Sequence, residues 1–192
     1  HYLFRMKIRT RFAPSPTGLL HIGGLRTALY NYVFSKKNNG EFILRIEDTD
    51  QKRLVKGATS KIINSLQSFN IEFDEGPNVN EKYGPYKQSE RLELYKSHYI
   101  KLIKKNFAYL CYINENKELI PENNIDKALE IIKKQNNSAT ENTPFVVKFK
   151  IPSTNHFKTY DKLRGEITFD LSLIDDPIII KSDGFPTYHF AN

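Results

Sequence analysis

Apolar and polar positions in the first seventy residues predict a strand, a helix, a second strand and a second helix. The runs KIRTRF at 7–12 and EFILRI at 41–46 are strand-like. Between them, apolar residues recur at helical spacing over 22–37, and they do so again over 57–70. A strand, a helix and a strand so close together form a βαβ unit, so we expect the two strands to be parallel. The apolar positions of the first helix are Ile22, Leu25, Leu29, Tyr32 and Val33.

Turn-forming residues divide the stretch that follows. Gly40, after two asparagines, suits the C-cap of the first helix. Residues 74–90 are punctuated by glycine and proline and are expected to form a loop. An amphipathic helix is predicted over 90–106.

Beyond residue 106 the pattern consists of short β-type runs. These runs are AYLCYI, PFVVKFKIP, GEITFDL and PIIIKSDG, and they are broken by one predicted helix near 122–135 and by the polar stretch QNNSATENT at 135–143. The chain is therefore expected to have an α/β fold, in which a parallel sheet is interrupted by an α+β insertion.

Composition narrows the class of protein. The chain has 192 residues, 39% of them hydrophobic, and no apolar run approaches the ~20 residues that a bilayer-spanning helix needs. Its start lacks the apolar segment of a secretory signal, so we expect no membrane association. Cys111 is the single cysteine, which excludes an internal disulfide and a multi-cysteine zinc site and fits a reducing cytoplasm. We predict no metal site in the chain.

The net charge of +7 favours polyanionic partners without identifying one. A basic surface attracts nucleic acids and anionic membranes alike, and a lysine-rich composition accounts for part of the charge.

The turn APSPTGLLHIGG at 13–24 is the first candidate for chemistry. In an open parallel sheet, ligands bind at the carboxyl ends of the strands, where the next helix also points its N-terminus. Gly23 and Gly24 lack a Cβ, so a ligand can approach the backbone, and His21 stands beside them as a donor. These features suit a nucleotide phosphate. The alternative is a tight turn that needs glycine only for packing.

Two further strings carry polar side chains. RIEDTD at 45–50 brings Glu47, Asp48 and Asp50 to the same sheet edge, where a carboxylate can hold an ammonium group, a metal or a ribose hydroxyl. The alternative is a solvated Glu47 and an aspartate that caps the next segment. In SDGFPTYHFAN at 182–192, Tyr188 and Asn192 are four residues apart and share a face if the segment is helical.

Four strings, RFAPSPTG, RIEDTD, GPYKQSERLELY and SDGFPTYH, occur in an order that resembles the bacterial glutamyl-tRNA synthetases, a branch of the class I aminoacyl-tRNA synthetases. LLHIGG is similar to their His-x-Gly-His signature, with Gly24 in place of the second histidine. The resemblance implies an incomplete Rossmann-like nucleotide-binding domain, with its first half at 1–85, an insertion at 86–186 that contacts the tRNA acceptor end, and the start of its second half at 187–192.

The resemblance also implies a function and a site. Glutamate would react with ATP, accompanied by Mg²⁺, to form glutamyl-adenylate, and the glutamyl group would then pass to tRNA(Glu). Arg11 is the candidate for a substrate carboxylate, because its planar fork matches carboxylate geometry, although it also fits a surface charge at a strand end. His21 and Gly23 are the candidate catalytic residues. The remaining expected contacts are Ala13, Ser15, Glu47, Tyr188 and Asn192 for glutamate, and Thr17, Gly18, His21, Gly23 and Gly24 for ATP.

Several alternatives stay open at this point. A KMSKS-like lysine loop and an anticodon-binding domain, both typical of the family, do not occur within these residues, so we expect this portion alone to be inactive. A truncated paralogue that glutamylates a modified tRNA base, a glutaminyl enzyme and a non-catalytic RNA-binding remnant are the competing interpretations. We further expect a monomer in the cytoplasm.

Overall fold

The computed structural model describes residues 7–134 and 144–192. The chain divides into two compact units, His1–Leu92 and Glu93–Asn192, each with an apolar core of its own. The polar stretch predicted at 135–143 lies outside the described residues. Within the described residues, no helix combines the length and the apolar character that crossing a bilayer requires.

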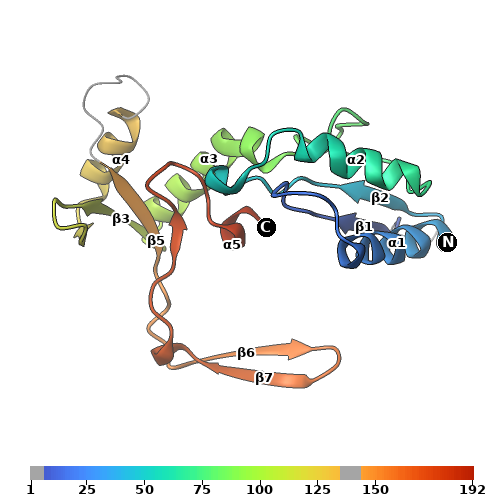
Figure 1. Cartoon of the computed structure of the whole chain (residues 1–192). Coiled ribbons are helices and arrows are strands. Elements are labelled where there is room, and N and C mark those ends of the chain that lie inside the picture. The colour runs from blue at the N-terminus through green and yellow to red at the C-terminus, as the bar shows by residue number, and fades with distance from the viewer. Residues whose placement is uncertain (1–6, 135–143) are drawn as a thin grey trace. The chain divides into compact units, whose positions relative to one another are not determined.

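The first unit contains the predicted βαβ arrangement. β1 (Arg9–Phe12) and β2 (Glu41–Leu44) pair in parallel, with Arg9 opposite Glu41 and Phe12 opposite Leu44. α1 (Ile22–Lys37) connects them, and α2 (Ala58–Ser68) follows (Figure 1). The parallel pairing and the bounds of α1 confirm the prediction made from the apolar pattern.

A third stretch of extended backbone lies along the other edge of β2. Parallel bridges join Ile43 to Glu75 and Ile46 to Lys87. Backbone hydrogen bonds run from Ile46 N to Tyr86 O at 2.8 Å and from Gln88 N to Ile46 O at 3.1 Å. Part of the predicted loop at 74–90 therefore extends the sheet. The backbone pairing with β2 shows this, whereas the pattern of the segment's own residues does not.

The core of the first unit joins alternate residues of one strand to both helices. Phe42 and Leu44 of β2 are fully buried and cluster with Ala28 of α1 and with Ile62 and Leu66 of α2. The apolar stripe predicted for α1 is only partly buried. Leu25 and Tyr32 pack against the core, whereas Ile22, Leu29 and Val33 are 80%, 45% and 51% exposed.

Gly40 has a different role from the predicted C-cap. The helix ends at Lys37 with Asn38 as its C-cap, and the residue with left-handed backbone is Asn39, at φ 51°. A Cβ on Gly40 would lie 2.3 Å from the carbonyl oxygen of Ile8, which itself accepts the N–H of Glu41 at 2.8 Å. Gly40 is therefore explained by the close approach of the two strands rather than by its φ angle.

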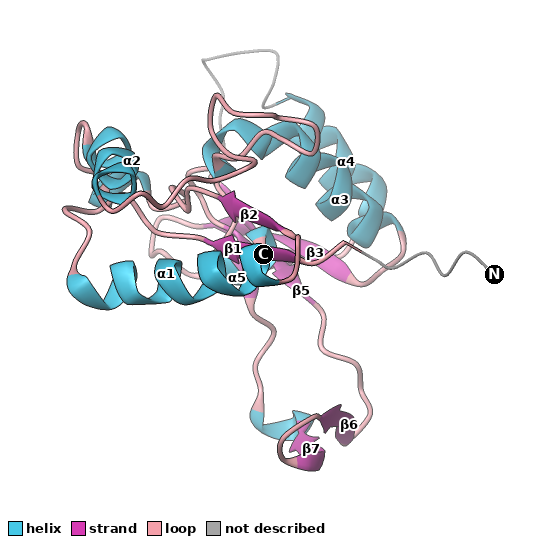
Figure 2. Cartoon of the chain, turned by 90° about the vertical axis from the view of Figure 1, so that its right-hand side faces the viewer, coloured by secondary structure: helices cyan, strands magenta, loops and turns pink. Residues whose placement is uncertain are grey.

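The second unit is built on an antiparallel sheet with the order β4-β3-β5-β8, of which β3 and β5 are labelled in Figure 2. Its apolar cluster contains residues of both longer helices and of β3, β5 and β8. The elements are α3 (Leu92–Lys104), β3 (Ala108–Ile113), β4 (Leu119–Glu122), α4 (Ile125–Lys134), β5 (Phe145–Phe149), β8 (Ile178–Ile180) and the short α5 (Tyr188–Ala191).

A hairpin forms a separate sheet in this unit. β6 (His156–Asp161) and β7 (Gly165–Asp170) pair antiparallel, with Phe157 opposite Phe169. The strand patterns at β3, β5, β7 and β8 are confirmed, whereas β4 and β6 were not predicted. The mixture of strands and helices agrees with the expected α+β character. The domain boundaries after 85 and 186 stay predictions.

Candidate functional site

Two parallel strands and the chain that continues beyond them bring the first candidate residues together. Past β1 and β2, Arg45 N donates to Phe12 O at 3.0 Å and Glu47 N donates to Pro14 O at 2.9 Å. Val55 N then donates to Pro16 O at 3.1 Å. The turn after β1 is thereby fixed beside the segment after β2, at the carboxyl edge where ligands of parallel sheets bind.

Five of the proposed site residues besides Glu47 lie along this edge. Arg11 is on β1, Ala13 and Ser15 flank the carbonyl that holds Glu47 in place, and Arg11 and Ser15 are exposed. Thr17 N donates to Ser15 O at 2.9 Å, which turns the chain toward α1, and the Thr17 side chain is exposed while Gly18 is half-buried. Their proximity follows from the sheet, and their roles toward a substrate remain predictions.

His21 is the N-cap residue of α1. Its backbone is extended, with φ −88° and ψ 163°, and its Nδ1 accepts the backbone N–H groups of Gly23 at 3.1 Å and of Gly24 at 3.3 Å. A nitrogen that accepts cannot carry the proton, so the neutral ring carries it on Nε2. The histidine is exposed, which leaves Nε2–H as the donor toward a ligand. The backbone N–H groups of Gly23 and Gly24 are thus both bonded to the imidazole.

The two glycines of this turn accommodate atoms of the protein itself. A Cβ on Gly23 would lie 3.0 Å from Cε1 of His21, and a Cβ on Gly24 would lie 2.7 Å from Cδ1 of Leu20. The ring of His21 therefore accounts for Gly23, whereas the atom nearest to a Cβ on Gly24 is the end of a side chain that can move aside. A ligand contact at either glycine stays a prediction.

Glu47 is buried and bonded on both carboxylate oxygens, so the alternative of a solvated side chain is wrong. The residue is 4% exposed. Arg45 Nε donates to its Oε1 at 2.6 Å, and Gln88 Nε2 lies 3.2 Å from each of Oε1 and Oε2. Removing a carboxylate from water is unfavourable unless it is paired and hydrogen-bonded, and these two partners supply both conditions.

The two aspartates of the same string differ from each other. Asp48 accepts from the backbone N of Ser89 at 2.8 Å and from its Oγ at 2.5 Å, so it supports a short 3₁₀ turn at Gln88–Arg91. Asp50 precedes the turn Gln51–Arg53 but makes no side-chain capping bond there. Sequence reasoning gave no role to Ser89 or Gln88, because both partners are distant in sequence from the RIEDTD string.

Tyr188 and Asn192 belong to the second unit. Tyr188 begins α5 and is 54% exposed. Its ring stands edge-on to that of His189, with 5.7 Å between the two ring centroids. Asn192 follows the helix, and its amide donates to the backbone O of Tyr188 at 3.2 Å. A shared pocket with Glu47 stays a prediction.

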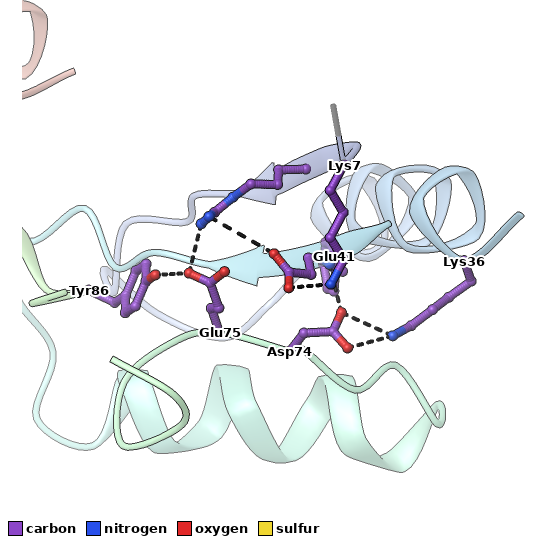
Figure 3. A network of polar contacts seen from close by, with 8 residues as sticks. Lys7, Lys36, Glu41, Asp74, Glu75 and Tyr86 are labelled. Carbon is purple, nitrogen blue, oxygen red and sulfur yellow. Dashed lines mark hydrogen bonds and ion pairs between the residues drawn. The ribbon is translucent and has the colours of Figure 1, made fainter. Parts of the chain in front are cut away.

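A polar network at the opposite end of the two strands holds the third extended segment in place (Figure 3). Arg9 Nη2 donates to buried Glu75 at 2.7 Å, and the hydroxyl of Tyr86 donates to the same carboxylate. Burial raises the pKa of the Tyr86 hydroxyl, and the carboxylate of Glu75 raises it further. These contacts join β1 to residues 75–86 and indicate a structural function.

Metal ligands do not gather among the described residues, where no cluster of three or more His, Cys, Asp or Glu side chains could hold an ion. Cys111 lies buried in β3, and burial raises the pKa of its thiol. A thiol is a poor metal ligand and nucleophile until it is deprotonated.

The parallel βαβ start, with a glycine-containing turn at the carboxyl ends of its strands, is the arrangement of a Rossmann-like fold. Residues 7–192 match the family described as tRNA synthetases class I (E and Q), catalytic domain. The chain belongs to this family, which confirms the resemblance drawn from its four motif strings.

Similar proteins agree with this assignment. The chain is 44% identical to a glutamate–tRNA ligase of Chlorobium phaeobacteroides and 47% identical to one of Mesomycoplasma hyopneumoniae, matching 97% of its own length and 40% and 42% of theirs. It also matches the crystal structure of a glutamate tRNA ligase from Elizabethkingia meningosepticum in complex with its amino acid, with a TM-score of 0.80, 36% identity, and coverage of 97% of this chain and 41% of that one. The chain therefore spans about two fifths of the length of these relatives.

Proposed function

We propose that the protein is a glutamate–tRNA ligase, which activates glutamate with ATP and transfers it to the 3′ end of tRNA. The observation that carries the proposal is the class I (E and Q) match over residues 7–192, together with relatives named glutamate–tRNA ligase at 44–47% identity. The carboxyl edge of β1 and β2, with Arg11, Ser15 and Glu47 along it, supplies charged and polar groups that suit a zwitterionic amino acid.

In the first step, a carboxylate oxygen of glutamate attacks the α-phosphate of ATP, and pyrophosphate leaves. Arg11 would pair with a carboxylate of the substrate, whereas Ser15 and Glu47 would receive its ammonium group. Ala13 would line the pocket with little bulk, and Tyr188 and Asn192 would complete it. Catalysis of this kind is mainly positioning and charge stabilisation, for which rigid strand ends are suited.

The ATP side of the site would be built on the turn before α1. His21 would donate through Nε2, because its Nδ1 is occupied by the N–H groups of Gly23 and Gly24. Thr17 and Gly18 would line the approach to the triphosphate, and Mg²⁺ would enter bound to ATP as part of the substrate. The positive end of the helix dipole favours the same anion.

The second step transfers the glutamyl group to the terminal ribose of tRNA(Glu). We propose that the α+β insertion contacts the acceptor end and that exposed lysines of this unit meet phosphates. A monomer acting in the cytoplasm is part of the same proposal.

Pyrophosphate exchange tests the proposal. The full-length gene product, incubated with ATP, Mg²⁺, labelled pyrophosphate and tRNA(Glu), should form labelled ATP only when glutamate is present. Charging of tRNA, followed by periodate treatment of the product, then separates the interpretations, because a glutamyl group on the terminal ribose protects that ribose whereas one on a modified base does not. Exchange with glutamine but not glutamate, or no exchange at all, would reject the proposal.

A further inference from the structure

The carboxylate of Glu47 is held by side chains from two distant parts of the first unit. Arg45, two residues away on the same segment, donates to Oε1 at 2.6 Å. Gln88, which lies 41 residues further along the chain, is 3.2 Å from both oxygens through its Nε2. Gln88 is fully buried, and Glu47 and Arg45 are 4% and 9% exposed.

Gln88 is itself fixed by the sheet. Its backbone N donates to Ile46 O at 3.1 Å, which places it directly beside the residue that precedes Glu47. The next residue, Ser89, donates twice to Asp48, from its N at 2.8 Å and from its Oγ at 2.5 Å. Two consecutive residues therefore hold two consecutive carboxylates, so the Gln88 side chain has little freedom to move relative to Glu47.

The two carboxylate oxygens of Glu47 accept different numbers of hydrogen bonds. A carboxylate offers about four acceptor positions. Among the described residues, Oε1 accepts from Arg45 and Gln88, whereas Oε2 accepts from Gln88. A neutral amide can fix the plane of the carboxylate without adding positive charge, whereas a second cation in its place would repel an incoming ammonium group.

We propose that Gln88 is a positioning residue for the amino-acid site, which holds Glu47 so that Oε2 receives the α-ammonium group of glutamate. The inference rests on the proposed function, since it takes glutamate as the substrate. Gln88 acts through Glu47 and does not touch the reacting atoms. Arg45 balances the charge of the carboxylate, so recognition of the ammonium group depends on the direction of Oε2 more than on net charge.

Substitution of Gln88 in the full-length protein tests this role. Gln88→Met keeps the length of the side chain and removes the donor, and Gln88→Asn keeps the amide but shortens its reach by one methylene. Gln67→Met, on the exposed side of α2, makes the same chemical change away from the site. Calorimetry would measure binding of glutamate and of ATP separately, and pyrophosphate exchange would give kcat and KM for each.

We expect both Gln88 variants to raise the glutamate KM and Kd, by about tenfold for Gln88→Met, since a hydrogen bond to a charged group is lost. The values for ATP should stay within about twofold, and Gln67→Met should match the wild type. Folded variants with a lower melting temperature and an unchanged glutamate KM would overturn the inference and leave the proposed function intact. An equal rise for ATP and glutamate would also overturn it. A wild type that neither binds nor activates glutamate would reject both.

Discussion

Nδ1 of His21 accepts the backbone N–H of Gly23 at 3.1 Å, so the histidine of the proposed ATP site is also the N-cap of α1. One imidazole therefore combines an observed function, capping of the helix, with a proposed one, contact with ATP. Nδ1 stabilises the helix, and Nε2 is the atom that can act on a ligand. Substitutions that keep one function and remove the other can distinguish them.

His21→Ala removes both functions, whereas His21→Asn keeps a side-chain acceptor for the cap. We expect the alanine variant to lose about 1 kcal/mol of unfolding free energy, as a lost N-cap does, and the asparagine variant to keep most of it. Both variants should slow pyrophosphate exchange by roughly 10²–10³-fold if Nε2 donates to ATP in the transition state. Thermal unfolding and pyrophosphate-exchange rates, measured on the same samples, compare the stability and the activity of the two variants. Full activity in His21→Asn would limit the histidine to capping.

Gly40→Ala should destabilise the first unit. The new Cβ would lie 2.3 Å from the carbonyl oxygen of Ile8, a backbone atom that accepts the first hydrogen bond between β1 and β2. Overpacking of this kind costs about 1–3 kcal/mol. Gly18→Ala is the matched control, since nothing lies within 4 Å of its added Cβ. Urea unfolding of both variants measures the difference, and equal stability would show that the strands separate at no cost.

Asp74 makes stability depend on pH in the acidic range. Burial acts to raise its pKa, but the Lys36 ammonium at 2.8 Å and the N–H of Phe42 at 2.7 Å outweigh it, and the pKa is lowered. Because the folded pKa is below the unfolded one, the stabilisation is complete above the unfolded pKa. It is lost as the pH falls through the folded pKa.

Asp74→Asn removes the charge and keeps an acceptor for Phe42 N. We expect it to cost about 0.5–1 kcal/mol at pH 7, because the partner lysine is partly exposed, and almost nothing at pH 2. Urea unfolding at several pH values would show the convergence. Glu72→Gln, on the same connection and exposed, should give no such trend. A difference that persists at pH 2 would mean that the carboxylate charge is not its source.

The sequence pattern predicted those helices and strands that are determined by residues near one another in the chain. The bounds of α1 follow from the apolar period between His21 and the two asparagines, and the parallel pairing of β1 and β2 follows from the short helical connection. The apolar period of a helix does not show which part of its apolar stripe will be buried in the core. Leu29 and Val33 continue the pattern but are exposed, and Ala28 is the residue that packs fully in the core.

Contacts between distant residues could not be predicted in this way. β4 contains a proline and has only four residues, and its strand character comes from pairing with β3. The bonds from Gln88 to Glu47 and from Ser89 to Asp48 each span 41 residues. The sequence offered no local signal for them, because a side-chain amide and a hydroxyl have many possible partners until the sheet aligns the two segments.

Glu47→Gln is the most informative single change, because it tests both the observed ion pair of the carboxylate with Arg45 and its proposed contact with the substrate. The variant keeps the shape and removes the charge, so it weakens the proposed hydrogen bond to the ammonium group of glutamate. It also removes the ion pair between Glu47 and Arg45, whose side chain is 11% exposed. Breaking a buried pair by removing one partner costs roughly 3–5 kcal/mol, and since the glutamine still accepts one bond we expect about 2–3 kcal/mol here.

The double variant Arg45→Met/Glu47→Gln separates the two effects. It removes both charges, so it should recover much of the stability lost by Glu47→Gln alone, as coupled residues do in a double-mutant cycle. Glutamate binding should stay weakened by about tenfold to a hundredfold in both variants, since neither has the carboxylate that receives the ammonium group. Calorimetry below the melting temperature, with ATP binding as the internal reference, measures this. If the double variant regained glutamate affinity together with stability, Glu47 would be a structural partner of Arg45, and the ammonium group of the substrate would bind elsewhere.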